Sequence, residues 1–249
     1  MLKYFWTYET DLPPNIGVAT FGVVHFAWVA MVLLMILLTL QIYRGQTAAN
    51  RRTIQVGAAY LLVIGYIVRW TWAAIIGHYS IVEMLPLHLC TISVIVEFAA
   101  VLSDRVILKE FAYCCSLPGA ISSLITPGMG LYPLLSYYYL QFAMAHMILI
   151  LLPLIWVFVD GFRPDIKRFP HCAGLLLVFA GIAFAVNQMI GSNYMFLSYA
   201  PKDTPLEVFE SWFGNPGYLI PTILLLFIIW FLFYIPWLIH SHMKRKREI

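Results

Sequence analysis

Long apolar runs separated by short polar segments dominate the chain. Each run has about the 20 residues that a helix needs to cross the hydrocarbon core of a bilayer. A transmembrane barrel would need segments of about ten residues with alternating polarity, and lipid offers no partners to open backbone. The pattern predicts an all-α polytopic membrane protein with seven transmembrane helices, at residues 20–43, 53–76, 85–102, 107–125, 137–159, 169–190 and 218–239.

The composition supports this fold class and excludes a soluble domain. Hydrophobic residues make up 62% of the 249 residues and charged residues only 11%, against roughly 25% charged in an ordinary soluble domain. We therefore expect one transmembrane domain over residues 1–249, with any chemistry inside or at the edge of the bilayer. The net charge of +3 does not indicate a nucleic-acid partner.

The distribution of Lys and Arg predicts the orientation. Twelve of these residues fall in one set of loops and in the C-terminal tail 244–247, whereas Lys3 and Lys202 fall on the other side. By the positive-inside rule the N-terminus lies outside and the C-terminus in the cytoplasm, which requires an odd number of spans. Seven spans satisfy this requirement.

Polar side chains inside the predicted spans gather toward one leaflet. Only Glu97 lies clearly deeper, toward the cytoplasmic side. Intramembrane polar groups are costly and usually face an interior cavity, so we expect a polar cavity that opens toward the outer leaflet. The alternative is that these groups only join helices through hydrogen bonds. The outer-half residues are His25, Arg69, His88, Cys90, Gln141, His146, Asn187 and Gln188.

Two of these positions suggest chemistry. Cys90 and His146 lie at similar predicted depth, as a cysteine nucleophile and its base require, although a buried Cys is often an inert apolar residue. Arg69 carries a permanent charge whose planar fork suits a phosphate or carboxylate, so we expect it to bind the substrate. Its alternative is to extend to the outer interface.

Cofactor chemistry finds little support in the sequence. Three histidines and Cys90 at similar depth allow a metal site, but no ligand pair at short spacing favours one. The seventh span has no Lys for a retinal Schiff base, and no phosphate-binding Gly pattern occurs. We expect neither a metal nor another cofactor.

Several segments resemble a known family. Pro86-Leu-His-Leu-Cys90, Phe142-Ala-Met-Ala-His146, Gly161-Phe-Arg-Pro164 and the segment from Asn187 to Leu197 are similar to the bacterial YwaF-like integral membrane proteins. The resemblance covers most of the chain. It implies a multi-pass protein of the bacterial cytoplasmic membrane.

A more distant resemblance implies an activity. This group looks like the eukaryotic transmembrane protein 164 acyltransferases and the androgen-induced-gene hydrolases, which implies a nucleophile and a His base on separate helices. His146 matches the family histidine. In the acyltransferases a Cys directly precedes the His of the third span, where this chain has Leu87, and Cys90 follows His88 by two residues. The hydrolases use a Thr, for which Thr91 is the match.

Two functional hypotheses emerge. In the first, the protein is a lipid acyltransferase or ester hydrolase with Cys90 or Thr91 as nucleophile and His146 as base. The substrate, a membrane lipid, would contact Arg69, His88, His25, Gln141 and Asn187. In the second, the same cavity binds or transports a small amphiphile without chemistry. Transporters often contain broken helices, and Pro118 and Pro153 are candidate breaks, but no matched pair of interrupted segments appears in two halves of the chain.

Overall fold

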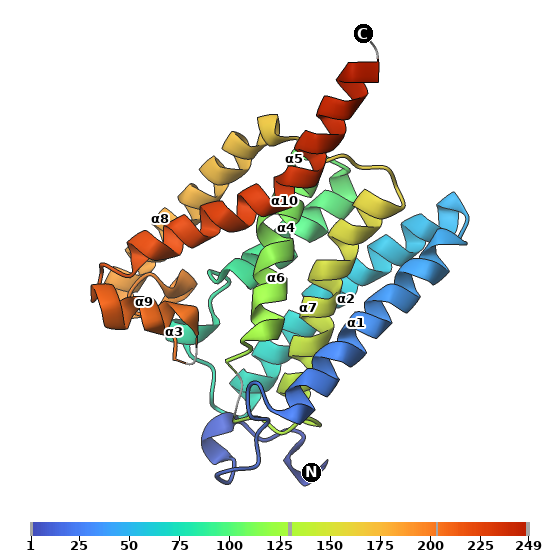
Figure 1. The fold of residues 1–249 in the computed structure, drawn as a ribbon. Helices are drawn as coiled ribbons and strands as arrows, with labels where there is room; N and C mark the ends of the chain where they lie inside the picture. Colours follow the sequence, from blue (N-terminus) through green and yellow to red (C-terminus); the bar gives the residue numbers. More distant parts are fainter. Residues whose placement is uncertain (1, 129–130, 203, 248–249) are drawn as a thin grey trace.

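The computed structural model describes residues 2–128, 131–202 and 204–247, and in this part every regular element is helical (Figure 1). Residue Asp203 and the side chains of 242 and 244–247 lie outside the described part. The elements are η1 (Leu2–Tyr4), η2 (Glu9–Asp11), α1 (Val23–Arg44), α2 (Ala48–Ile75), α3 (Ile81–Met84), α4 (Leu89–Ser103), α5 (Val106–Phe111), η3 (Ala112–Ser116), α6 (Leu117–Ile125), α7 (Tyr137–Phe158), η4 (Ile166–Arg168), α8 (Phe169–Ile190), η5 (Tyr194–Phe196), α9 (Pro205–Phe213) and α10 (Leu219–Arg247).

Among the described residues, five helices are long and apolar enough to cross a membrane: α1, α2, α7, α8 with η4, and α10 over Leu219–Ser241. The predicted all-helical membrane fold is thus confirmed. α4 has only 15 residues, about 22 Å at 1.5 Å per residue, and the next predicted span consists of α5, η3 and α6 in direct succession. The seven-span count and the orientation remain predictions.

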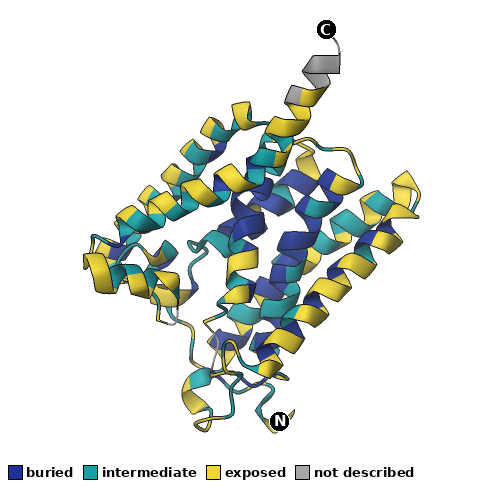
Figure 2. Cartoon of the chain, in the orientation of Figure 1, coloured by how far each residue is buried: buried dark blue, intermediate teal, exposed yellow. Residues whose placement is uncertain are grey.

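The helices differ sharply in burial, and α7 forms the centre. In its most apolar stretch 67% of the residues are buried, against 11% in α8 and in α10. α1, α2, α4 and α6 all pack against α7, and Figure 2 shows the buried residues concentrated on these central helices. Side chains on α7 are therefore shielded on most sides, which suits a site that excludes water.

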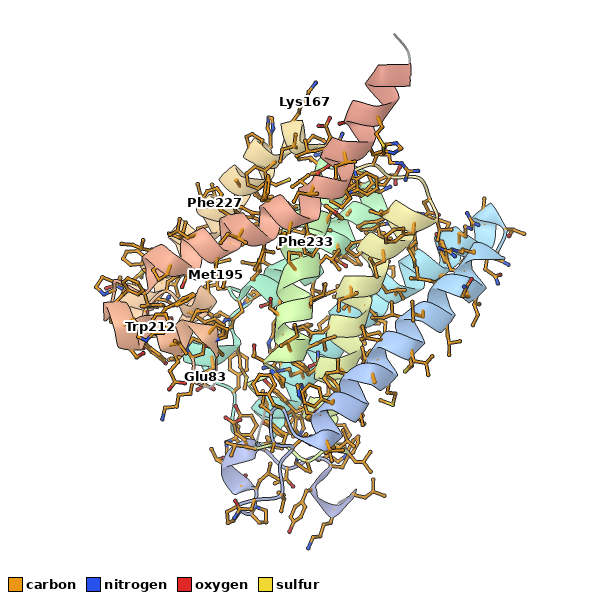
Figure 3. All side chains as sticks on the ribbon, viewed as in Figure 1. Glu83, Lys167, Met195, Trp212, Phe227 and Phe233 are labelled. Atoms are coloured by element: carbon orange, nitrogen blue, oxygen red, sulfur yellow. The ribbon has the colours of Figure 1, made fainter. Side chains whose placement is uncertain are left out.

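α10 crosses the central helices (Figure 3) and is joined to η3 by hydrogen bonds near the middle of α10. The Trp230 indole donates to the carbonyl of Cys114 at 2.7 Å, and the Tyr113 hydroxyl donates to the carbonyl of Phe233 at 2.7 Å. Earlier on the helix, Phe227 is 53% exposed. This helix is therefore attached to the core around its middle.

Neither candidate break interrupts its helix as expected. α7 continues through Pro153 from Tyr137 to Phe158. Pro118 stands in the first turn of α6, and the irregularity falls just before it, in the π-helical turn η3. Because α6 continues directly from η3, the N–H that Pro118 lacks is missing within a continuous helical run, and the π-helical turn just before it widens the backbone and often marks a functional region.

The segments 44–52, 103–110 and 160–168, which we call the basic end, contain three ion pairs among the described residues, two of them between segments and one within a segment. Arg51 lies 3.7 Å from Asp160, and Lys109 lies 2.6 Å from Asp104. The termini lie at opposite ends of the bundle in Figure 1. These loops carry eight of the twelve Lys and Arg residues from which the cytoplasmic side is predicted.

Candidate functional site

Cys90 stands in the first turn of α4, directly after the N-cap residue His88 and Leu89. The first N–H groups of a helix have no partner within it, and here the first such bond runs from Ile92 N–H to the carbonyl of His88 at 3.0 Å. The amides of Cys90 and Thr91 are therefore free to donate next to the thiol. The partial positive charge of a helix N-terminus also favours negative charge at this position.

His146 lies on α7 and faces Cys90. Its Nε2 is 3.3 Å from Cys90 Sγ, and its Nδ1 is 2.9 Å from the carbonyl oxygen of Phe142. A carbonyl can only accept, so Nδ1 carries the proton and Nε2 of the neutral ring accepts from the thiol. The backbone thus holds the tautomer that a general base for Cys90 requires. His146 is 3% exposed and Cys90 is partly exposed.

Ser123 on α6 is the third member of this cluster, and the sequence did not single it out. Its Oγ lies 3.4 Å from Cys90 Sγ. Because the thiol proton points to His146, the Ser123 hydroxyl is left to donate to sulfur. The sequence carries no local pattern that links Ser123 to Cys90, because the two residues are 33 positions apart. Only the packing of α4 against α6 brings them together.

Arg69 lies on α2 against tyrosines of the core. Its Nη2 donates to the Tyr138 hydroxyl at 2.6 Å, and its guanidinium stacks on the Tyr138 ring at 4.3 Å from the ring centre. Its Nε is buried without a hydrogen-bond partner. The guanidinium is therefore only partly satisfied, and its remaining donors suit an oxygen ligand.

Gln141 lies on the same helix face as Tyr138, one turn further along α7. Its side chain approaches Gly65 of α2, which has no side chain to occupy this space. The Gln141 Nε2 is buried and without a partner. Arg69 and Gln141 thus present two unsatisfied donors at the interface of α2 and α7.

His88 and Thr91 flank the nucleophile but are held by other contacts. The His88 ring packs on Tyr194 and Phe196, with ring centres 5.0 and 5.5 Å apart. The Thr91 hydroxyl donates to the carbonyl of His88 at 3.0 Å. In the described hydrogen bonds, His146 therefore pairs with Cys90, whereas the Thr91 hydroxyl bonds to the backbone at the start of its own helix.

Both ring nitrogens of His25, on α1, have backbone partners, one just before α1 and one on α6. Nδ1 accepts from the amide of Phe21 at 3.1 Å, and Nε2–H donates to the carbonyl of Leu124 at 3.0 Å. Both nitrogens are occupied, so the contacts of His25 are those of a structural residue between α1 and α6.

Asn187 organises the loop that follows α8. Its Oδ1 accepts from Ser192 Oγ and from the amide of Tyr194, both at 2.7 Å, and its Nδ2 donates to the carbonyl of Tyr194 at 3.0 Å. This amide is satisfied within its own loop. The loop in turn brings Tyr194 against His88.

The metal alternative gains no support from this arrangement. Within residues 2–128, 131–202 and 204–247 no three His, Cys, Asp or Glu side chains gather as metal ligands would. The three histidines instead have separate partners: Leu124 for His25, Tyr194 for His88 and Cys90 for His146.

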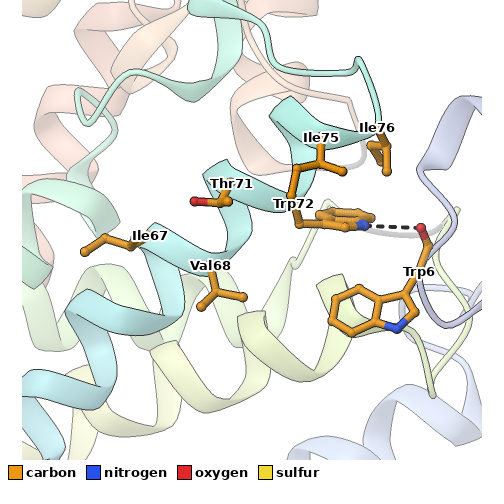
Figure 4. Close-up of a pocket in the computed structure, with 7 residues that line it drawn as sticks. All are labelled: Trp6, Ile67, Val68, Thr71, Trp72, Ile75 and Ile76. Atoms are coloured by element: carbon orange, nitrogen blue, oxygen red, sulfur yellow. Dashed lines mark hydrogen bonds between the residues drawn. The ribbon is translucent and has the colours of Figure 1, made fainter.

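A shallow pocket of about 470 Å³ lies elsewhere on α2 (Figure 4). Its lining is almost wholly apolar, and Trp72 Nε1 donates to the carbonyl of Trp6 at its edge, at 3.2 Å. No side chain of the Cys90 cluster lines it. The polar cavity predicted from the sequence is therefore a different feature, and it remains a prediction.

Comparison with known proteins identifies the family of this chain. No curated protein and no solved structure matches the chain. The family model that does match covers residues 20–234, from just before α1 to the second half of α10, and so includes the whole Cys90 cluster. The chain is a multi-pass membrane protein that belongs to the TMEM164 family.

Proposed function

We propose that the protein is a membrane-embedded enzyme that transfers or hydrolyses an acyl group of a lipid through Cys90 and His146. The observation that carries this proposal is the contact of 3.3 Å between His146 Nε2 and Cys90 Sγ, with Nδ1–H held by a backbone carbonyl. A nucleophile, a base and a group that orients the base are the parts of covalent acyl chemistry.

The proposed reaction has two steps. The Cys90 thiol gives its proton to His146 Nε2 as Sγ bonds to the acyl carbon, and the ester C–O bond breaks as the alcohol takes that proton. A second alcohol or water then attacks the thioester, giving its proton to His146, and the thiol is restored. Transfer and hydrolysis differ only in the acceptor. The free amides of Cys90 and Thr91 are suitably placed to stabilise the oxyanion.

The substrate is a lipid because the site lies within the membrane-spanning region. Arg69 and Gln141 offer unsatisfied donors, and we assign them to the polar part of the lipid, with His88 beside the nucleophile. We also infer seven spans, with α4 and the run from α5 to α6 as the third and fourth, and the basic end in the cytoplasm. This arrangement corresponds to a YwaF-like protein of the bacterial cytoplasmic membrane.

Mass spectrometry of the purified protein, incubated with a membrane lipid extract, tests the proposal. We expect an acyl adduct on Cys90 that is lost in Cys90→Ala and in His146→Ala. Cys172→Ala is the matched control, because this thiol on α8 is buried against the carbonyl of Ile107 and takes no part in the Cys90 cluster. Thr91→Val tests the alternative nucleophile. An unmodified protein carrying an intact lipid would instead identify a binding or transport protein.

Arg69 allows a test of the substrate assignment. Arg69→Lys keeps the charge and loses the planar fork, whereas Arg69→Ala loses both. We expect Arg69→Ala to raise the lipid concentration needed for half-maximal adduct formation by about tenfold or more, since hydrogen bonds to charged groups contribute about 1.5–3 kcal/mol. Equal behaviour of wild type and both variants would contradict the assignment.

A further inference from the structure

A second buried polar cluster lies below Cys90 and takes no part in the proposed reaction. It consists of Glu97 and Ser93 on α4 and Ser116 at the end of η3. Glu97 is 0% exposed, and the two serines are 1% exposed. No partner lies within hydrogen-bonding distance and angle of either carboxyl oxygen of Glu97 or of the two serine hydroxyls.

This cluster is continuous with the Cys90 cluster. Cys90, Ser93 and Glu97 are spaced i, i+3 and i+7, so they lie along one face of α4. Ser116 and Ser123 are likewise seven positions apart on the facing helix, where Ser123 touches Cys90 at 3.4 Å and Ser116 neighbours the Glu97 carboxyl. A seam of polar groups therefore runs between α4 and the η3–α6 segment, from the thiol to the carboxyl.

The carboxyl of Glu97 has no cationic partner in the described ranges that would compensate a negative charge. Burying an unpaired carboxylate is very unfavourable, and none of the ion pairs in the described ranges involves Glu97. Five elements pack against α4, of which α6 carries no titratable side chain. Those on the other four are Arg51, Arg52, Tyr60, Tyr66 and Arg69 on α2, Lys109 and Glu110 on α5, Tyr113, Cys114 and Cys115 on η3, and Tyr137, Tyr138, Tyr139 and His146 on α7.

The cations in this set have other partners. Arg51 pairs with Asp160, Lys109 pairs with Asp104, and Arg69 donates to Tyr138. Arg52 donates to the backbone carbonyl of Val101. A proton can neutralise the Glu97 carboxylate without a further side chain, and it needs almost no volume in a close-packed core.

We propose that Glu97, with Ser93 and Ser116, forms a proton-binding site that controls the reactivity of Cys90. With the proton bound the cluster is neutral. Without it, a negative charge stands two helical turns from Cys90, about 10.5 Å along the axis, and opposes a second negative charge on the thiolate. At an effective dielectric constant of about 20 this repulsion lowers the thiolate fraction by roughly tenfold.

Alkylation of Cys90 by a membrane-permeant maleimide, followed by mass spectrometry across a pH series, tests the proposal. Glu97→Gln removes the titrating group and keeps its shape. We expect the rate ratio of Glu97→Gln to wild type to be near one at low pH and to rise toward about tenfold once Glu97 loses its proton. Glu83→Gln on the exposed surface of α3 is the matched control and should show a ratio near one throughout.

A ratio that does not change with pH would overturn the proposal, because a merely structural role for Glu97 alters the rate equally at every pH. A ratio that follows the sodium concentration at fixed pH would also overturn it, in favour of a metal cation. Infrared spectroscopy gives a second test should Glu97→Gln not fold. The wild type must show the C=O band of a protonated carboxyl group. This band should persist in Glu83→Gln and shift in Ser116→Ala. A spectrum without the band would refute the site.

The inference rests on the reactivity of the Cys90–His146 pair that the proposed function requires, yet the two can fail separately. Maleimide alkylation needs no lipid turnover. Loss of the acyl adduct with a persistent pH-dependent ratio would end the proposed enzyme and leave the proton site. An acyl adduct with a constant ratio would do the reverse.

Discussion

Two glutamates of this protein are both 0% exposed and have opposite surroundings. Glu110, at the basic end, accepts from Arg168 Nε at 2.7 Å, from the Tyr234 hydroxyl at 2.6 Å, and from the amide of Asp165 at 3.1 Å. Glu97, two turns below Cys90 on α4, has no partner on either oxygen. A buried carboxylate requires such compensation, so the first glutamate is built into the fold and the second is open to a ligand or a proton.

The contrast extends to the regions around them. Among the described residues, the buried side-chain polar atoms without partners lie on α1, α2, α4, η3 and α7: Trp28 Nε1, Arg69 Nε, Ser93 Oγ, both Glu97 oxygens, Ser116 Oγ, the Tyr139 hydroxyl and Gln141 Nε2. At the basic end the loops are joined by ion pairs and satisfied carbonyls. Buried polar groups are nearly always satisfied in a stable fold. A concentration of exceptions in one region therefore indicates a site rather than a scaffold.

The largest effect is expected when the base of the Cys90 cluster is removed, which tests whether this region is a site rather than a scaffold. His146→Ala should slow acyl-adduct formation on Cys90 by about a hundredfold or more, because general-base catalysis contributes about 10²–10⁴-fold. Thermal unfolding in detergent should change far less than the reaction rate. A variant that keeps its adduct would show that the contact between His146 and Cys90 is only structural.

The next test concerns the satisfied glutamate. Glu110→Ala leaves Arg168 and Tyr234 without their partner and should lower the free energy of unfolding by about 3–5 kcal/mol. Glu97→Gln, its matched counterpart, should change it by no more than about 1 kcal/mol, because Gln reproduces the shape of a neutral carboxyl group. Equal losses in the two variants would remove the distinction between the regions.

A smaller effect is expected from the loop after α8. Asn187→Ala removes the acceptor of Ser192 and of the Tyr194 amide, and leaving such buried groups unpaired costs about 1–3 kcal/mol. Hydrogen–deuterium exchange should show faster exchange in residues 191–198. Because this loop carries Tyr194 against His88, the rate of Cys90 alkylation should also rise as access improves. An unchanged exchange rate would contradict the role of Asn187 in the loop.

The mildest change sharpens the description of the nucleophile. Ser123→Ala deletes the hydroxyl that donates to Cys90 Sγ, a hydrogen bond of about 1 kcal/mol. Because this bond stabilises the thiolate, the substitution should lower the alkylation rate by about fivefold. The neighbouring Ser122, which is exposed on α6, is the control, and Ser122→Ala should leave the rate unchanged. A similar effect of both substitutions would assign the change to the helix rather than to the hydroxyl.

The sequence predicted the helices well because a bilayer imposes a simple rule on length and polarity. The predicted span 137–159 corresponds to α7 at Tyr137–Phe158, and 169–190 corresponds to α8 at Phe169–Ile190. It was less accurate where local backbone decides the outcome. The helix that corresponds to the predicted span 85–102 is α4, which begins at Leu89 because Leu85 is extended before Pro86 and a turn at 86–87 precedes the helix.

For the site, the sequence supplied the candidates but not their connections. Depth along the helices was enough to place Cys90 and His146 at one level, since each residue advances a helix by a fixed distance. Depth does not give the rotation of one helix against another. Only the packed structure shows that His25 is engaged by Leu124, that Asn187 is engaged by its own loop, and that Ser123 reaches Cys90.

The sequence by itself thus determined an all-helical membrane protein and the polar residues buried within it, because hydrophobic length and the cost of a polar group in lipid act on each segment separately. Only the tertiary structure decided which of these polar groups satisfy one another. That result depends on the rotation and close approach of helices far apart in the chain. It separates Glu110, whose charge is compensated by Arg168, from Glu97, whose carboxyl lies unpaired beside the seam that leads to Cys90.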